Sequence, residues 1–109
     1  MDIEVSFPGG KRVAASFGAH RVLTDQPREL GGEDAAPAPF ELFLASLATC
    51  AGIYVLGFCQ ARGLATEGFA ITQRSENDPE TKLPRRIELT VRLPADFPEK
   101  YKPAELPAA

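Results

Sequence analysis

The sequence predicts an α+β fold in which antiparallel strands flank one long helix, and three observations support this prediction. Residues 2–7 and 87–93 alternate between apolar and polar side chains, the period of a strand with one buried face. Residues 42–61, LFLASLATCAGIYVLGFCQA, contain no charged residue and are long enough for a single extended helix. The order of strands, helix and strands differs from the βαβ alternation that produces a parallel sheet.

The N-terminal third is predicted to be an antiparallel meander followed by a loop. The strand at residues 2–7 (DIEVSF) ends at the turn Pro8-Gly9-Gly10. Residues 11–16 and 20–24 are expected to form two further strands. Residues 25–38 are rich in Gly, Pro and acidic side chains, which predicts an exposed loop.

The helix is expected to begin at Pro39 and to end near Arg62. Proline suits the first helical position because the N–H group that it lacks would have no helical partner there. Glu41 then lies in the first turn, where the helix dipole favours a carboxylate. Gly63 is expected to terminate the helix.

A β-hairpin is predicted after the helix. Its first strand covers residues 68–74, a polar turn covers residues 75–82, and its second strand covers residues 87–93. One helical turn can follow Pro98. Two later prolines prevent a longer helix, and these are Pro103 and Pro107.

Composition limits the classes of function that the chain can serve. A chain of 109 residues corresponds to one domain, so residues 1–109 are expected to form a single domain. The 12 basic and 15 acidic residues give a net charge of −3, which argues against a nucleic-acid or anionic-membrane partner. No signal peptide is visible, so we expect a cytoplasmic protein with free thiols. No Cys/His cluster has metal-ligand spacing, and we expect neither a metal nor another cofactor.

The apolar run at residues 42–61 could in principle be a membrane span, since about 20 residues cross the hydrocarbon core. Basic residues are not concentrated on one side of it, and its flanks resemble amphipathic strands. A buried helix is therefore the favoured interpretation. A chain this short covers such a helix poorly, so we expect a second copy to cover it in a homodimer. The small residues that would permit close packing are Ala45, Ser46, Ala48, Ala51, Gly52 and Gly57.

Cys50, near the middle of this run, is either an inert core thiol or a sheltered reactive one. Burial alone raises the pKa of a thiol, so a reactive Cys50 would need a cation or hydrogen-bond donors from outside its own helix. From the residues alone, the inert core thiol is the commoner case. Cys59 and Glu41 each lie nine residues from Cys50, on the opposite side of a continuous helix and about 13.5 Å away along its axis. Neither can contact Cys50 within that helix. The only histidine, His20, belongs to no sequence motif that would place it beside a reactive thiol.

The segment PAPFELFLASLATCAGIYV, with the Gly-Gly-rich loop before it and QARGL after it, resembles the OsmC/Ohr family. The prolines Pro37 and Pro39, together with Glu41 and Cys50, follow that family's proline, carboxylate, helix and cysteine pattern. The resemblance implies an α+β fold in which two chains intertwine around central helices. It also implies thiol-dependent reduction of organic hydroperoxides, with Cys50 as the attacking thiolate and a thiol compound as reductant.

Three departures from the family pattern affect which of the family's catalytic residues can be assigned to positions of this sequence. The family's second, resolving cysteine lies on a later helix, and we expect this chain to lack both. The clear hydroperoxide reductases place a carboxylate ten residues before the cysteine, where this chain has Phe40, and the acid here is Glu41 at nine. The activating arginine follows a Gly-Gly turn in those enzymes, and here Lys11 intervenes before Arg12.

The resemblance therefore implies Cys50, Glu41 and Arg12 as catalytic residues, with Arg21 as a rival to Arg12. It places the chain in a branch close to the less characterised OsmC-like members. Two alternatives stay open, a catalytically silent dimer that binds a small apolar ligand at the subunit interface and a structural dimer with an inert thiol.

Overall fold

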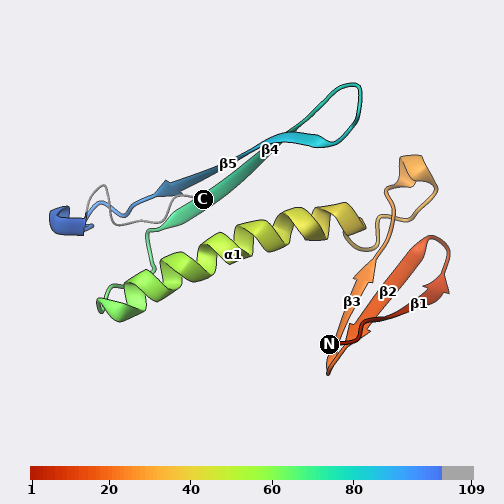
Figure 1. The fold of residues 1–109 in the computed structure, drawn as a ribbon, viewed down its shortest axis with the longest axis horizontal. Helices are drawn as coiled ribbons and strands as arrows, with labels where there is room; N and C mark the ends of the chain where they lie inside the picture. The colour runs from red at the N-terminus through yellow and green to blue at the C-terminus, as the bar shows by residue number, and fades with distance from the viewer. Residues whose placement is uncertain (102–109) are drawn as a thin grey trace. The chain divides into compact units, whose positions relative to one another are not determined.

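The computed structural model describes residues 1–101 of the chain. Three strands come first, followed by a short 3-10 turn, one long helix, a two-stranded hairpin and a second 3-10 turn (Figure 1). The chain forms two compact units, one from Met1 to Ala45 and the other beginning at Ser46. The predicted α+β class, with antiparallel strands and one long helix, is confirmed, while the expectation of a single domain over residues 1–109 stays a prediction.

The first unit contains an antiparallel sheet with the strand order β1-β2-β3. Its strands are β1 (Glu4–Gly9), β2 (Arg12–Phe17) and β3 (His20–Thr24), so the predicted meander is confirmed and the third strand has the predicted bounds. Strand β2 is central, and its Ala14 is fully buried. The pairing of β1 with β2 is irregular between Ser6 and Gly9, where the predicted Pro-Gly-Gly turn begins.

The segment after β3 is more ordered than the predicted exposed loop. It contains a 3-10 turn, η1 (Arg28–Leu30), closed by Gly31 in the left-handed region. Its first residue, Asp25, is only 1% exposed. The prediction of an exposed loop over residues 25–38 is therefore wrong at Asp25, because the loop folds back and surrounds that carboxylate with backbone N–H groups.

Helix α1 (Pro39–Ala61) is continuous and matches the predicted bounds closely. At its start, the Ala38 N–H donates a 2.8 Å hydrogen bond to Oε1 of Glu41, which is one half of a capping box. At its end, Gly63 has a φ of 66°, and the Leu64 N–H donates a 2.8 Å hydrogen bond to the Cys59 carbonyl. This pair of features is a Schellman motif, so Gly63 terminates the helix as predicted.

The second unit contains the predicted hairpin, formed by β4 (Ala70–Asn77) and β5 (Pro84–Arg92). Its first strand continues three residues beyond the predicted end at Arg74. The turn instead begins at Asp78, whose Oδ1 accepts hydrogen bonds of 2.8 Å from the Glu80 N–H and 3.1 Å from the Thr81 N–H. Of the apolar face predicted for the second strand, Ile87 is exposed while the side chains nearer the core are half-buried.

The hydrophobic core of the second unit lies between the C-terminal half of α1, the hairpin and the residues around η2 (Glu99–Tyr101). Phe97 is central, and its ring lies 6.3 Å from Phe58 and 5.8 Å from Phe69, measured between centroids. The predicted helical turn after Pro98 is confirmed as η2, whereas Pro103 and Pro107 lie outside the described residues. The buried members of this core are Val55, Phe58, Cys59 and Phe97.

Most of α1 is not covered within the single chain. Its buried side chains are Val55, Phe58 and Cys59, so the prediction of a buried helix holds only near its C-terminal end. By length and composition α1 could also cross a membrane, but the core helix of a soluble protein satisfies the same criterion. The physical reason for the exposure is size, since a chain of this length has too little surface to enclose a helix that is apolar on all sides.

Candidate functional site

The two cysteines of α1 lie in opposite environments. Cys50 is exposed and Cys59 is fully buried, and both are free thiols. The helix is unbroken between them, so their nine-residue separation, about 13.5 Å along the axis and on opposite sides, excludes an intrahelical disulfide. Cys59, which the sequence alone would place in the core or at an interface, lies in the core, and Cys50 is the thiol that a molecule outside the single chain can reach.

Cys50 lies within an exposed apolar stripe of α1. At 100° per residue, Phe43, Tyr54 and Ile53 project within about 60° of Cys50 around the helix axis. Their exposed fractions are 53%, 64% and 59%. The buried residue Cys59 points to the opposite side. The inert-core interpretation of Cys50 therefore does not describe the single chain, because its surroundings are an open apolar face.

Glu41 caps the start of the helix that carries Cys50. Its carboxylate accepts the hydrogen bond from the Ala38 N–H, and the residue is exposed. Because α1 is continuous, Glu41 and Cys50 remain about 13.5 Å apart along the axis of the same helix. A contact between this carboxylate and the Cys50 sulfur would therefore require a second copy of the chain.

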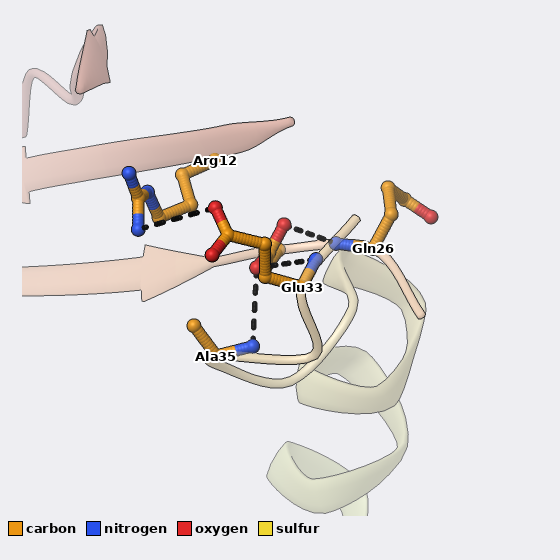
Figure 2. A network of polar contacts seen from close by, with 5 residues as sticks. Arg12, Gln26, Glu33 and Ala35 are labelled. Atoms are coloured by element: carbon orange, nitrogen blue, oxygen red, sulfur yellow. Dashed lines mark hydrogen bonds and ion pairs between the residues drawn. The ribbon is translucent and has the colours of Figure 1, made fainter. Parts of the chain in front are cut away.

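Arg12 lies on β2 within a polar network of the first unit (Figure 2). Its Nη1 atom is 4.0 Å from Oε1 of Glu33, and its side chain is about one-third exposed. Its Nε atom is buried and makes no hydrogen bond within residues 1–101. Arg12 is therefore held by charge and packing more than by hydrogen bonds.

Asp25 is the acceptor at the centre of this network. Its Oδ1 accepts a 2.7 Å hydrogen bond from the Gln26 N–H, and its Oδ2 accepts bonds of 3.3 Å and 3.1 Å from the N–H groups of Glu33 and Ala35. The N–H groups of Ala35 and Gln26 are the main cause of a lowered pKa for Asp25, with Glu33 N–H and the positive charge of Arg12 acting in the same direction. Burial opposes this effect, and the net direction of the pKa is downward.

The sequence did not single out Asp25. The available signal was its position, since an Asp directly after a strand and before a Gly-rich loop commonly accepts hydrogen bonds from the following N–H groups.

The other candidate residues named from the sequence have simpler surroundings. His20 and Arg21 are exposed on β3, and the His20 ring lies 5.8 Å from that of Phe17. Within residues 1–101, no three His, Cys, Asp or Glu side chains are grouped so that they could hold a metal ion.

A comparison with protein-family models matches residues 31–106 to the OsmC-like protein family. The chain belongs to the OsmC-like family. This family includes redox and hydroperoxide-resistance proteins, and its members are typically dimeric. The fold is soluble, and the apolar α1 is its core helix rather than a membrane span.

A solved structure with a similar fold accompanies this OsmC-like match, and a second solved structure is similar at a lower TM-score. A candidate osmotic stress induced and detoxification response protein from Psychrobacter arcticus 273-4 has 18% sequence identity and a TM-score of 0.68, over 82% of this chain. An organic hydroperoxide resistance protein OsmC from Legionella pneumophila has 25% identity and a TM-score of 0.46, over 84% of this chain. The OsmC-like chain spans 66% of the length of each. No curated protein matches it.

Proposed function

We propose that this OsmC-like protein is a homodimeric thiol peroxidase that reduces organic hydroperoxides in the cytoplasm through Cys50. The observation that carries the proposal is the placement of Cys50 on the exposed apolar stripe of α1, while Cys59 is buried in the core. A peroxidatic sulfur must be reachable by its substrate, and an apolar surround favours the organic part of an alkyl or aryl hydroperoxide.

The proposed reaction transfers two electrons from sulfur to the peroxide. The Cys50 thiolate attacks the terminal oxygen of ROOH, an S–O bond forms and the O–O bond breaks. Cys50 becomes a sulfenic acid, and the alkoxide that leaves takes up a proton to give the alcohol. A small thiol then condenses with the sulfenic acid, releasing water and forming a mixed disulfide. A second thiol reduces this disulfide and restores Cys50.

An external thiol is required because Cys59 cannot resolve the Cys50 sulfenic acid. The two cysteines project to opposite sides of the continuous helix, about 13.5 Å apart along its axis. Cys59 is also fully buried among aromatic side chains. A single-cysteine cycle follows for the part of the chain that the structure describes.

The dimer in this proposal covers the exposed apolar face of α1 on either side of Cys50 and leaves a path for the substrate to its sulfur. Large apolar side chains are exposed along α1, and on β1 the alternating residues Val5 and Phe7 are 57% and 80% exposed. Exposed apolar surface of this extent is typical of an interface between subunits.

Arg12 is proposed as the cation that favours the thiolate form of Cys50. Glu41 of a second copy is proposed as the carboxylate that orients this cation. Glu41 of the same chain lies too far along the helix to reach a cation that stands beside the Cys50 sulfur.

The test is the rate of cumene hydroperoxide consumption with dithiothreitol as reductant. Wild-type protein is expected to consume the peroxide, Cys50→Ser to lose this activity, and Cys59→Ala to retain it. Equal rates in Cys50→Ser and wild type would exclude Cys50 as the peroxidatic residue.

The second candidate function is a catalytically silent dimer that binds a small apolar molecule. The exposed side chains of Phe43, Ile53 and Tyr54 favour it, because they offer apolar contacts whether or not the thiol reacts. Binding of an apolar fluorescent probe to wild type and Cys50→Ser with equal affinity, without any peroxide consumption, would support this second function.

A further inference from the structure

The carboxylate of Asp25 is enclosed at the point where β3 ends. It accepts hydrogen bonds from three backbone N–H groups, two of which come from residues eight and ten positions later in the chain. The Asp25 N–H in turn donates a 3.1 Å hydrogen bond to the carbonyl of Pro37, two residues before α1 begins. One residue thus anchors both the middle and the end of the segment at residues 26–37.

Gly32 allows the segment to close around this carboxylate. A Cβ atom at Gly32 would overlap the carbonyl oxygen of Gln26 and would lie 2.9 Å from Oδ1 of Asp25. The Gly32 N–H donates a 3.1 Å hydrogen bond to the Pro27 carbonyl, which completes the fold of the loop. The tight approach shows that the surroundings of Asp25 are closely fitted rather than loosely packed.

The loop that encloses Asp25 also brings a second carboxylate, that of Glu33, beside the Arg12 guanidinium. The Glu33 N–H binds Oδ2 of Asp25, while the Glu33 side chain extends to within 4.0 Å of the Arg12 guanidinium (Figure 2). Arg12 therefore lies beside the negative charge of Glu33 and also interacts electrostatically with the Asp25 carboxylate. Because its buried Nε makes no hydrogen bond within residues 1–101, the orientation of Arg12 within a single chain depends on these two charges.

We propose that Asp25 is a positioning residue for Arg12. By holding the Glu33 backbone, Asp25 fixes the carboxylate that faces the guanidinium, and its own charge keeps Arg12 in place. This inference rests on the proposed function, in which Arg12 is the cation that favours the Cys50 thiolate. Asp25 itself has no contact with substrate in this account and acts only through Arg12.

The experiment compares Asp25→Asn with Asp78→Asn in the full-length protein. Both changes remove a carboxylate that accepts backbone N–H bonds in a loop, but Asp78 lies in the hairpin turn of the second unit. The first readout is the Nε–H resonance of Arg12 in the NMR spectrum of ¹⁵N-labelled protein, which does not require activity. The second readout is the rate of Cys50 oxidation by cumene hydroperoxide, measured also in an Arg12→Gln background.

Asp25→Asn is expected to shift the Arg12 Nε–H resonance and to increase its exchange with water, while Asp78→Asn leaves it unchanged. It is also expected to slow Cys50 oxidation roughly 10- to 100-fold, the scale of a misplaced catalytic group. In the Arg12→Gln background this further slowing should disappear, because Asp25 then has no guanidinium to position. Should Asp25→Asn fail to fold, Glu33→Gln, at an exposed side chain, is expected to produce the same shift at Arg12.

Two results would overturn the inference. One is an Arg12 Nε–H resonance that neither Asp25→Asn nor Glu33→Gln changes. The other is an equal slowing by Asp25→Asn with and without Arg12, which would indicate a general effect on the fold. A shifted Arg12 resonance in a protein that does not react with peroxide would instead contradict the proposed function and support the positioning of Arg12 by Asp25.

Discussion

The Ala35 N–H donates a 3.1 Å hydrogen bond to the buried carboxylate of Asp25, which lies ten residues earlier in the chain. This bond, together with those from Gln26 and Glu33, is formed with a negatively charged acceptor. Protonation of Asp25 would weaken all three at once. The acid stability of the first unit therefore depends on this carboxylate.

The pH dependence of unfolding follows from the lowered pKa of Asp25. A group whose pKa is lower in the folded state stabilises the protein above its unfolded pKa and loses that contribution as the pH falls through the folded value. We expect Asp25→Asn to lower the melting temperature at neutral pH, and the difference from wild type to shrink below about pH 4. Thermal unfolding by circular dichroism between pH 2 and pH 7 measures this. A difference that stays constant across the range would contradict it.

Gly32→Ala is expected to destabilise the protein by on the order of 2–3 kcal/mol, because the added methyl group overlaps backbone atoms of Gln26. Gly57→Ala is the matched control for the single chain, measured at protein concentrations too low for the proposed dimer to form. It lies within α1, where a Cβ meets no other atom within 4 Å, and alanine favours a helix by about 1 kcal/mol over glycine. Urea unfolding should give opposite signs for the two variants. Similar stability changes would mean that the loop can shift to admit a side chain.

Phe97→Ala is expected to cost about 3–5 kcal/mol, since it removes the ring at the centre of the second unit's core. Leu83→Ala, at a 62% exposed position in the hairpin turn, should change the free energy of unfolding by less than about 0.5 kcal/mol. Denaturant unfolding provides the measurement. Equal effects of the two substitutions would show that the aromatic cluster does not stabilise this unit.

Gly52→Leu is expected to abolish the proposed dimer by overpacking the contact between helices. Within the single chain a Cβ at Gly52 meets nothing within 4 Å, so the substitution does not strain the monomer. Sedimentation velocity at micromolar concentration should show a dimer for wild type and a folded monomer for the variant. A dimeric Gly52→Leu would mean that the helices pack elsewhere, and a monomeric wild type would contradict the dimer itself.

Local sequence patterns predicted the elements well where a single physical rule determined them. The proline at position 39 and the glycine at position 63 each located an end of the helix, because these signals act within a few residues. The hairpin was predicted, but its turn was placed too early because Asp78, and not the polar run before it, forms the turn's hydrogen bonds.

The surroundings of the candidate site could not be predicted in the same way. The apolar run around Cys50 has no polar side, so periodicity could not show which face the hairpin covers, and the structure places Cys50 on the uncovered one. The enclosure of Asp25 depends on a loop that returns to it after eight to ten residues. Such a return follows from tertiary folding and leaves only a weak signal in local composition.

The central claim is that Cys50, and not Cys59, is the peroxide-reactive thiol. Its most direct measurement is mass spectrometry of the wild-type protein after cumene hydroperoxide in the presence of dimedone, which traps sulfenic acid. The account predicts one dimedone adduct per chain, located at Cys50, and none at the buried Cys59. An unmodified Cys50, or an adduct confined to Cys59, would contradict it.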